Sequence, residues 1–326
     1  ALPIWFMSPD LFEQILNYLI RLEILDRNNN CQVALFNWGE PFLNPNINEI
    51  LEITKKKRFY AQISSNFIVK PDISKELLPT ISDITFSLSG FSQQSYGRIH
   101  GASLNKTLEN FDAFYNNVRR YSPRTHIRIS WHRYQFNEHE LWDAYRFFNR
   151  PCIRFYPSVA FFIDFLEMIA FLKRELPEDR IRQAEKELFL DHIRKGISRS
   201  KKDSRNYHCS ASNFLVIDEI GQLLLCCGVT SYDSDCVLGN ILEMPAKEIW
   251  EKKSTNPLCD ECLPIGLALW IYNQNPYNDK PWPPGGGWDA PKAWFLYNLR
   301  PSIGRIIRKF PNGDRLLNMV KRIPWV

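Results

Sequence analysis

Apolar residues along the first part of the chain recur in two periods, one typical of strands and one typical of helices. Compact apolar runs at residues 33–36, 60–65 and 84–88 predict buried strands. Residues 47–57 and 74–78, which lie between these runs, are spaced as on one face of a helix. Strands and helices in alternation indicate parallel strands joined by helical crossovers. The pattern therefore predicts an α/β fold.

The same alternation continues as far as residue 156. Helices are expected at residues 104–119 and 138–148, and strands at residues 125–131 and 152–156. Ser8-Pro9-Asp10 has the residues of a helix start, so the first helix is expected to begin there.

The segment Gly39-Glu40-Pro41 follows the first of these predicted strands. Glycine allows a sharp turn and proline fixes the next φ, so Glu40 is expected to point over the end of the strand. An ionised carboxylate only accepts hydrogen bonds, and its natural partner there is a cationic group such as an ammonium. A helix-capping turn is the alternative interpretation.

Polar residues also stand at the ends of the next two predicted strands. Ser64-Ser65-Asn66 ends one strand, and Ser87-Leu88-Ser89-Gly90 ends the other. The C-terminal ends of parallel barrel strands share one rim, where ligands bind. We therefore expect these residues and Glu40 to line one site.

The order of the three strand ends resembles that of the radical SAM enzymes, whose partial barrel binds S-adenosylmethionine along this rim. The resemblance implies a partial (β/α)6 TIM-like barrel, whose first strand and cluster loop are missing from this chain, and S-adenosylmethionine as cofactor. In the family the Gly-Glu-Pro segment meets the methionyl ammonium, while Ser and Asn positions of the next strands approach the ribose and the carboxylate. The residues implied here are Gly39, Glu40, Pro41, Ser65, Asn66, Ser87 and Ser89.

The resemblance extends through Tyr96, Arg98 and Gly101 to the strand that ends at His132. It implies that His132 meets the adenine and that Arg98 holds a carboxylate. Two other interpretations stay open, because a histidine at a strand end also suits a structural role and Arg98 also suits a surface ion pair. No catalytic residue is assigned.

The cysteine motif that holds the catalytic cluster of the family is absent. Radical SAM enzymes bind that cluster through Cys-x3-Cys-x2-Cys after the first strand, and no such spacing occurs in the 326 residues. An N-terminally incomplete chain is the favoured explanation, and a member that has lost its radical chemistry is the other. We expect that the chain as given does not cleave S-adenosylmethionine by itself.

A second group of cysteines lies towards the C-terminus. Cys209 and Cys226 flank a predicted hairpin at residues 213–225, which brings their thiols together. Cys259 and Cys262 have the spacing that lets both thiolates reach one metal centre. Four thiolates are therefore expected to meet at one centre.

The pattern Cys-x11-Gly-x4-Cys followed by Cys-x2-Cys is similar to the first part of the SPASM extension, which carries auxiliary iron–sulfur clusters in radical SAM enzymes. No cysteine follows Cys262, so the resemblance implies one auxiliary 4Fe-4S cluster, as in the shortened twitch version. A structural zinc site is the alternative, because four thiolates suit tetrahedral zinc equally well. Cys227 or Cys236 in place of Cys226 also stays open.

The pattern divides the chain into four predicted regions. These are a barrel at 1–156, a charged helical linker at 157–205, a metal-binding domain at 206–265, and a Trp/Pro/Gly-rich segment with basic amphipathic helices at 266–326. The basic helices suit docking on the protein's own core, and contact with a membrane surface, an acidic peptide or another partner is the alternative. The net charge of +5 is mild and predicts no nucleic-acid partner.

The resemblance implies a radical SAM enzyme that abstracts hydrogen from a peptide, a sugar or another small molecule, with a reductant such as flavodoxin or ferredoxin. The cysteine content without a secretory signal in the residues given predicts a reducing compartment, the cytoplasm. The alternative from a different functional class is a non-catalytic binding module, with a degenerate barrel and a structural zinc site.

Overall fold

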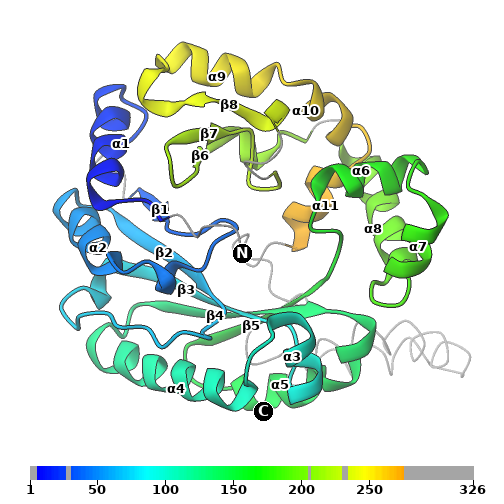
Figure 1. Ribbon diagram of the computed structural model, residues 1–326, viewed down its shortest axis with the longest axis horizontal. Coiled ribbons are helices and arrows are strands. Elements are labelled where there is room, and N and C mark those ends of the chain that lie inside the picture. Colours follow the sequence, from blue (N-terminus) through cyan, green and yellow to red (C-terminus); the bar gives the residue numbers. More distant parts are fainter. Residues whose placement is uncertain (1–5, 27–30, 205–206, 230–233, 275–326) are drawn as a thin grey trace, which may run out of the picture.

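The computed structural model describes residues 6–26, 31–204, 207–229 and 234–274. Five parallel strands form the main sheet in the order of the chain, and they curve around one side of the molecule (Figure 1). The strands are β1 (Gln32–Ala34), β2 (Tyr60–Ser65), β3 (Ile81–Leu88), β4 (His126–Arg133) and β5 (Ile153–Val159). This arrangement confirms the predicted partial α/β barrel.

Helices cover the outer face of this sheet. Phe111 and Phe148 contribute to the apolar core between the two layers, where they pack against Phe86 of β3. α1 packs on α2 through Phe12 and Ile50 in a second cluster. The helices are α1 (Pro9–Arg21), α2 (Ile47–Lys56), α3 (Gln93–His100), α4 (Leu104–Tyr121) and α5 (Leu141–Phe148).

The opposite face of the sheet is polar. Along β3, Ile84 and Phe86 belong to the apolar core, whereas the alternate residues Asp83 and Thr85 are buried polar residues. In β4, Arg128 likewise lies in the alternate row. Because successive strand residues point to opposite faces, one face packs on the helices and the other faces the centre of the molecule (Figure 1).

The C-terminal half builds a second core around a small antiparallel sheet, in the order β6-β7-β8. Phe165 and Ile193, from the segment predicted as a charged linker, join Leu223 and Trp270 in this core. The strands are β6 (Val216–Ile217), β7 (Gln222–Leu224) and β8 (Val237–Asn240). The helices are α6 (Phe165–Lys173), α7 (Glu178–Ala184), α8 (Leu190–Asp203), α9 (Ala246–Ser254), α10 (Pro257–Cys262) and α11 (Leu267–Gln274).

Three local predictions were wrong. The run at 33–36 is not a buried strand: β1 pairs with β2 alone among the described strands, and its residues are partly exposed. Residues 74–78 do not form an α-helix: residues 75–77 are a turn, and the short 3-10 helix Leu78–Thr80 follows it. In the hairpin, residues 210–213 are a 3-10 turn, so β6 is shorter than predicted.

No helix in the described ranges is both long enough and apolar enough to cross a membrane. The Trp/Pro/Gly-rich segment and the basic amphipathic helices predicted towards the C-terminus lie outside the described residues, apart from residues 266–274.

Candidate cofactor rim and cysteine cluster

Glu40 lies at the C-terminal end of the sheet, in the loop that follows β1. Its Oε2 accepts a hydrogen bond from the amide of Asn66 at 2.8 Å, and its Oε1 accepts one from the amide of Phe42 at 3.2 Å. Glu40 is also the N-cap of the 3-10 helix Pro41–Leu43. The carboxylate therefore joins the end of β1 to the end of β2, and it acts as a cap as well as an acceptor at the rim.

The environment of this carboxylate disfavours its charge. Burial raises the pKa of Glu40, and hydrogen bonds from Asn66, Ser65 and Phe42 only partly offset that effect. No cationic side chain among the described residues contributes to the shift. At Gly39, an added Cβ would meet nothing within 4 Å, so the rim is open beside Glu40.

Ser65 and Asn66 fix the turn after β2. The Ser65 hydroxyl accepts the amide of Phe67 at 2.9 Å, and the Asn66 side chain accepts the amide of Ile68 at 3.0 Å. The Asn66 carbonyl accepts the hydroxyl of the buried Tyr96 at 3.3 Å. Both predicted residues therefore shape the rim beside Glu40.

Ser89 and His132 meet across the ends of β3 and β4. The Ser89 hydroxyl lies 3.2 Å from Nδ1 of His132, and the Ser130 hydroxyl lies 3.4 Å from Nε2 of the same ring. Ser87, on the same strand face as Ser89, is in register with Ser130. The structure thus brings Ser87, Ser89 and His132 together on adjacent strands.

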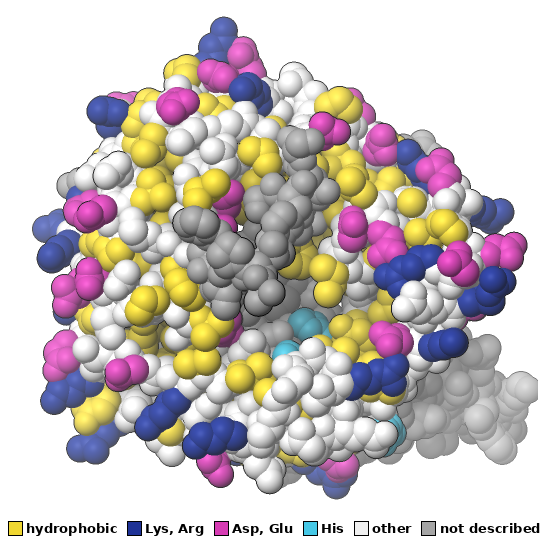
Figure 2. All heavy atoms as spheres, in the orientation of Figure 1, with side chains coloured by type: hydrophobic (Ala, Val, Ile, Leu, Met, Phe, Trp, Pro, Cys, Tyr) yellow, Lys and Arg dark blue, Asp and Glu magenta, His cyan; other side chains and the backbone are white. Residues whose placement is uncertain are grey.

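His132 is uncharged at neutral pH. Burial lowers its pKa to about 4. Burial, and then the nearby His132, lowers the pKa of His100 to about 4 as well, and the His100 ring stacks on Tyr96 with a centroid distance of 4.5 Å. Figure 2 shows histidine side chains inside the hollow at the centre of the molecule. The imidazole rings of His132 and His100 are therefore neutral hydrogen-bonding groups and carry no positive charge at neutral pH.

Glu140 holds the loop that follows Ser89. Its Oε2 accepts the amide of Phe91 and the hydroxyl of Ser95, each at 2.6 Å. Burial opposes ionisation, but hydrogen bonds from Ser92, Ser95 and Phe91 outweigh it and lower the pKa of Glu140. Sequence patterns did not reveal this residue, because its partners are brought to it only by the fold.

Arg98 contacts a side chain of this protein and not the cofactor carboxylate that the resemblance implies. Its guanidinium forms an ion pair with Glu187 at 2.6 Å and lies 4.6 Å from the ring centroid of Phe136. About half of the Arg98 side chain is exposed. The structure thus places Arg98 in a contact between α3 and the segment before α8, and does not bring it into contact with Glu40.

The C-terminal cysteines gather in one region of the second core. Cys262 is buried in that core, and Cys226 and Cys259 pack against it. Burial, followed by the charges of Cys226 and Cys209, raises the pKa of Cys262 to about 12. The amide of Gly228 donates to the sulfur of Cys226 at 3.4 Å, a contact that favours a thiolate.

The thiols do not converge on a single point. In the parts of the chain that the structure describes, no group of three or more His, Cys, Asp or Glu side chains is arranged to hold a metal ion. All eight cysteines are free. The structure thus gathers Cys209, Cys226, Cys259 and Cys262 in one neighbourhood but leaves the metal centre a prediction.

Known structures share this architecture. No family model and no curated protein matches the sequence. Streptococcus suis SuiB bound to S-adenosylmethionine aligns over 84% of this chain and 68% of SuiB, with a TM-score of 0.51 and 15% identity. SuiB bound to the precursor peptide SuiA aligns over 83% and 67%, with a TM-score of 0.51 and 15% identity. SuiB is a radical SAM enzyme. The chain shares the partial α/β-barrel fold of SuiB.

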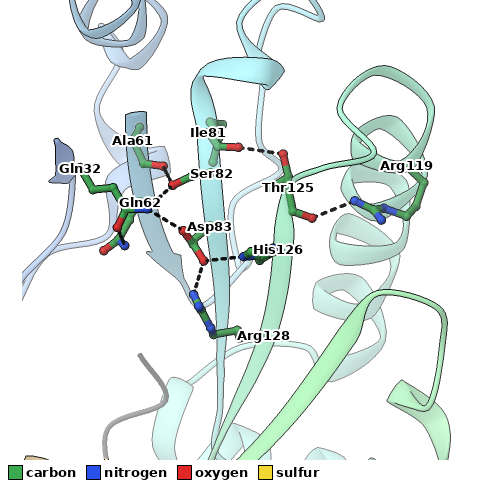
Figure 3. Close-up of polar contacts among 10 residues, drawn as sticks. All are labelled: Gln32, Ala61, Gln62, Ile81, Ser82, Asp83, Arg119, Thr125, His126 and Arg128. Carbon is green, nitrogen blue, oxygen red and sulfur yellow. Dashed lines mark hydrogen bonds and ion pairs between the residues drawn. The ribbon is translucent and has the colours of Figure 1, made fainter. Parts of the chain in front are cut away.

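The barrel of this chain also contains a buried charge network that the sequence patterns did not indicate (Figure 3). Arg128 of β4 forms an ion pair with Asp83 of β3, and both side chains are almost fully buried. His126 and Gln32 also contact the Asp83 carboxylate, each at 3.4 Å. These residues lie towards the N-terminal ends of the strands, away from the rim that carries Glu40.

Proposed function

We propose that the protein binds S-adenosylmethionine along the rim of its barrel, with Glu40 as the acceptor for the ammonium. The observation that carries this proposal is the geometry of Glu40: a partly buried carboxylate at the rim that accepts the amides of Asn66 and Phe42, whose pKa is raised by burial, and on which no cationic side chain acts among the described residues. An incoming ammonium would supply the missing positive charge and a charge-assisted hydrogen bond.

The remaining rim residues suit the other polar groups of the same ligand. Asn66 and Ser65 lie beside Glu40 at the end of β2, and Ser89 and His132 meet at the ends of β3 and β4. A neutral imidazole donates from one nitrogen and accepts at the other, which suits the edge of an adenine. Gly39 leaves space beside Glu40 for the ligand to approach the backbone.

We propose the reaction class of a radical SAM enzyme. S-Adenosylmethionine, after one-electron reduction at an iron–sulfur cluster, would supply the group that abstracts hydrogen from the substrate. These 326 residues contain no Cys-x3-Cys-x2-Cys spacing for that cluster, so their own tasks are to bind, orient and shield the cofactor. A reductant such as flavodoxin or ferredoxin would supply the electron.

A peptide is the substrate class that we propose first. The support is the likeness of the fold to SuiB, which has been seen with a precursor peptide, and the polar inner face of the sheet. Peptide groups present donors and acceptors that would match polar side chains on this face, such as Ser130.

We further propose that Cys209, Cys226, Cys259 and Cys262 hold an auxiliary 4Fe-4S cluster. The support is that Cys262 lies in the second core with Cys226 and Cys259 packed against it, that the charge of Cys209 acts on Cys262, and that an amide donates to Cys226. A structural zinc ion remains the second candidate, since four cysteine thiols suit both centres. In that case a barrel without turnover would act as a binding module.

Calorimetric titration of the anaerobic protein with S-adenosylmethionine tests the proposed rim site. Glu40→Gln keeps the shape and one acceptor oxygen but removes the charge, so affinity is expected to fall by at least about tenfold. Glu49→Gln, an exposed carboxylate in the first turn of α2, is the matched control and should leave affinity unchanged. Equal affinity in the wild type and Glu40→Gln would reject Glu40 as the ammonium acceptor.

Activity needs a separate measurement. A chain that contains the cluster motif should form 5′-deoxyadenosine in the presence of a reductant, and Glu40→Gln should slow this formation. Binding without any 5′-deoxyadenosine from such a chain would favour the binding module over the enzyme.

A further inference from the structure

The helix α8 carries a row of basic side chains on its exposed face. Lys195, Arg199 and Lys202 follow one another at intervals of four and three residues, so they lie on one side of the helix. All three are exposed, and no carboxylate in the described part of the chain forms an ion pair with them. These three residues form the α8 stripe.

Basic residues of the neighbouring helices have partners within the protein. Lys173 of α6 pairs with Glu261, and Arg180 of α7 pairs with Glu167. Like charges one turn apart destabilise a helix when nothing compensates them. The α8 stripe is therefore a concentration of positive charge that the described residues leave without a partner.

The opposite side of α8 is fixed in the second core. Ile193 and Ile197 are buried there. Gly196 allows a close approach, because a Cβ at this position would overlap the indole of Trp270. The core thus holds the stripe on a firm helix, and binding would have to order only its side chains.

α8 begins next to the C-terminal end of β4. The guanidinium of Arg133, the last residue of β4, lies 5.8 Å from the ring centroid of Phe189, which is the N-cap residue of α8. A chain that lies along α8 would therefore continue beside the cofactor rim.

A histidine in the first turn of α8 reports the electrostatic potential of this face. Burial lowers the pKa of His192. Nearby charges lower it as well, those of Arg133, Arg199 and Lys195, whereas that of Glu138 raises it. The potential is therefore positive from the end of β4 along α8.

The surroundings of the stripe favour an acidic peptide over other polyanions. α8 contains no Phe, Tyr or Trp that could stack on a base. Its isoleucines are buried in the protein's own core, so they cannot insert into a membrane. Asp191 and Asp203, at the two ends of the helix, would repel a long phosphate chain.

We propose that the α8 stripe binds an acidic segment of a peptide partner, whose carboxylates pair with Lys195, Arg199 and Lys202. The stripe extends over about 10 Å along the helix, the length of about three residues of an extended peptide. Arg199, at the centre, can hold a carboxylate through two N–H groups, and the lysines act as point charges. The identity of this partner with the substrate rests on the peptide substrate proposed above, whereas the binding itself does not.

Fluorescence anisotropy with a labelled hexaglutamate peptide tests this proposal, and labelled hexaglutamine is the uncharged reference. The triple variant Lys195→Glu/Arg199→Glu/Lys202→Glu reverses the charge of the stripe. The wild type should bind hexaglutamate but not hexaglutamine, and added salt should weaken the binding. Reversal of the stripe should lower the affinity at least about tenfold, because attraction is replaced by repulsion.

The matched control reverses two lysines and one arginine that are exposed elsewhere in the chain, in the variant Lys56→Glu/Lys70→Glu/Arg124→Glu. Its net charge equals that of the stripe variant, and it should bind hexaglutamate as the wild type does. An equal loss in both variants would overturn the proposal, since net charge alone would then explain the binding. Wild-type affinity in a folded stripe variant, or no binding of hexaglutamate by the wild type, would overturn it as well.

Phosphate-bearing polyanions are the competing occupants of the stripe. Octauridylate and vesicles of phosphatidylserine are therefore titrated under the same conditions. Tighter binding of either than of hexaglutamate, lost in the stripe variant, would overturn the assignment to an acidic peptide. If the stripe variant does not fold, Arg199→Glu alone replaces it, and unchanged affinity in that variant would equally reject the site.

The calorimetric titration with S-adenosylmethionine separates this inference from the proposed function. The stripe variant should bind S-adenosylmethionine as the wild type does, because its substitutions lie outside the rim. A protein that binds hexaglutamate but not S-adenosylmethionine would refute the rim and support the α8 stripe. Binding of S-adenosylmethionine without binding of hexaglutamate would refute the stripe and support the rim.

Discussion

The indole of Trp38 donates a hydrogen bond to the carbonyl of Val229 at 2.9 Å. Trp38 belongs to the loop that carries Glu40, and Val229 belongs to the loop that begins at Cys226. This bond therefore ties the candidate cofactor rim to the cysteine region across a large separation in sequence. A hydrogen bond between two loops stabilises both of their conformations.

Trp38→Phe should lower the free energy of unfolding by about 0.5–1.5 kcal/mol, because phenylalanine keeps an aromatic ring but cannot donate to Val229. Urea denaturation followed by circular dichroism measures the change. Tyr18→Phe is a useful comparison, since its hydroxyl donates to the carbonyl of Met244 at 3.0 Å and joins α1 to the same half of the molecule. A stability equal to that of the wild type would mean that the Trp38 bond is exchanged for water without loss.

The glycine at the end of β3 is expected to be sensitive to substitution. A Cβ at Gly90 would lie 2.4 Å from both the Ser95 hydroxyl and the Tyr96 amide, which belong to the first turn of α3. Gly90→Ala must therefore push α3 away from the rim, and overpacking of this kind costs about 1–3 kcal/mol. Thermal unfolding measures the loss.

Gly39→Ala is the control for Gly90→Ala, because a Cβ there meets nothing within 4 Å. Its stability should match or slightly exceed that of the wild type. If both substitutions destabilise the protein equally, the close approach of α3 to Gly90 is not the cause.

The charge network on the inner face of the sheet also predicts a large effect. Asp83→Ala leaves the buried guanidinium of Arg128 without this carboxylate, and breaking such a pair costs about 3–5 kcal/mol. Asp143→Ala breaks a pair with Arg146 in which both side chains are mostly exposed, so it should cost no more than about 1 kcal/mol. Urea denaturation compares the two.

A double variant separates charge from packing in this network. Asp83→Asn combined with Arg128→Met removes both charges and should be less destabilised than Asp83→Ala. A double variant that is at least as unstable as Asp83→Ala would indicate that packing, rather than unpaired charge, controls stability at this position.

The sequence predicts the strand ends well because their residues are local signals. Glu40, Asn66 and Ser89 each follow an apolar run, and parallel topology then brings them to one rim. Residues whose role depends on partners far away in the sequence cannot be identified from such local signals. Glu140 receives its donors from Phe91 and Ser95, and Trp38 finds its acceptor, the carbonyl of Val229, far along the chain.

The predictions for the edge strand of the sheet and for the short elements were the least accurate, for a related reason. Residues 33–36 have the apolar character of a buried strand, but β1 has one neighbouring strand in the described sheet, so its side chains are only partly covered. Arg98 illustrates the same limit, because its contact with Glu187 depends on how α3 meets a segment far along the chain. Local pattern cannot specify such tertiary neighbours.

The two buried histidines predict how stability depends on pH. The pKa values of His132 and His100 are about 4 in the folded protein, compared with 6.5 for an ordinary histidine. Between these values the unfolded chain binds more protons than the folded chain, so the free energy of unfolding falls as the pH is lowered from 6.5 towards 4. Each histidine contributes up to about 3 kcal/mol above this window.

His132→Gln removes one of these proton sites and should make stability less dependent on pH between 6.5 and 4. His139→Gln is the control, because the His139 side chain is mostly exposed, and its pH profile should follow that of the wild type. Urea denaturation at intervals across the window gives the slope for each protein. A His132→Gln profile parallel to the wild type would contradict a neutral His132, whereas a flatter profile would establish that the rim offers an uncharged imidazole to its ligand.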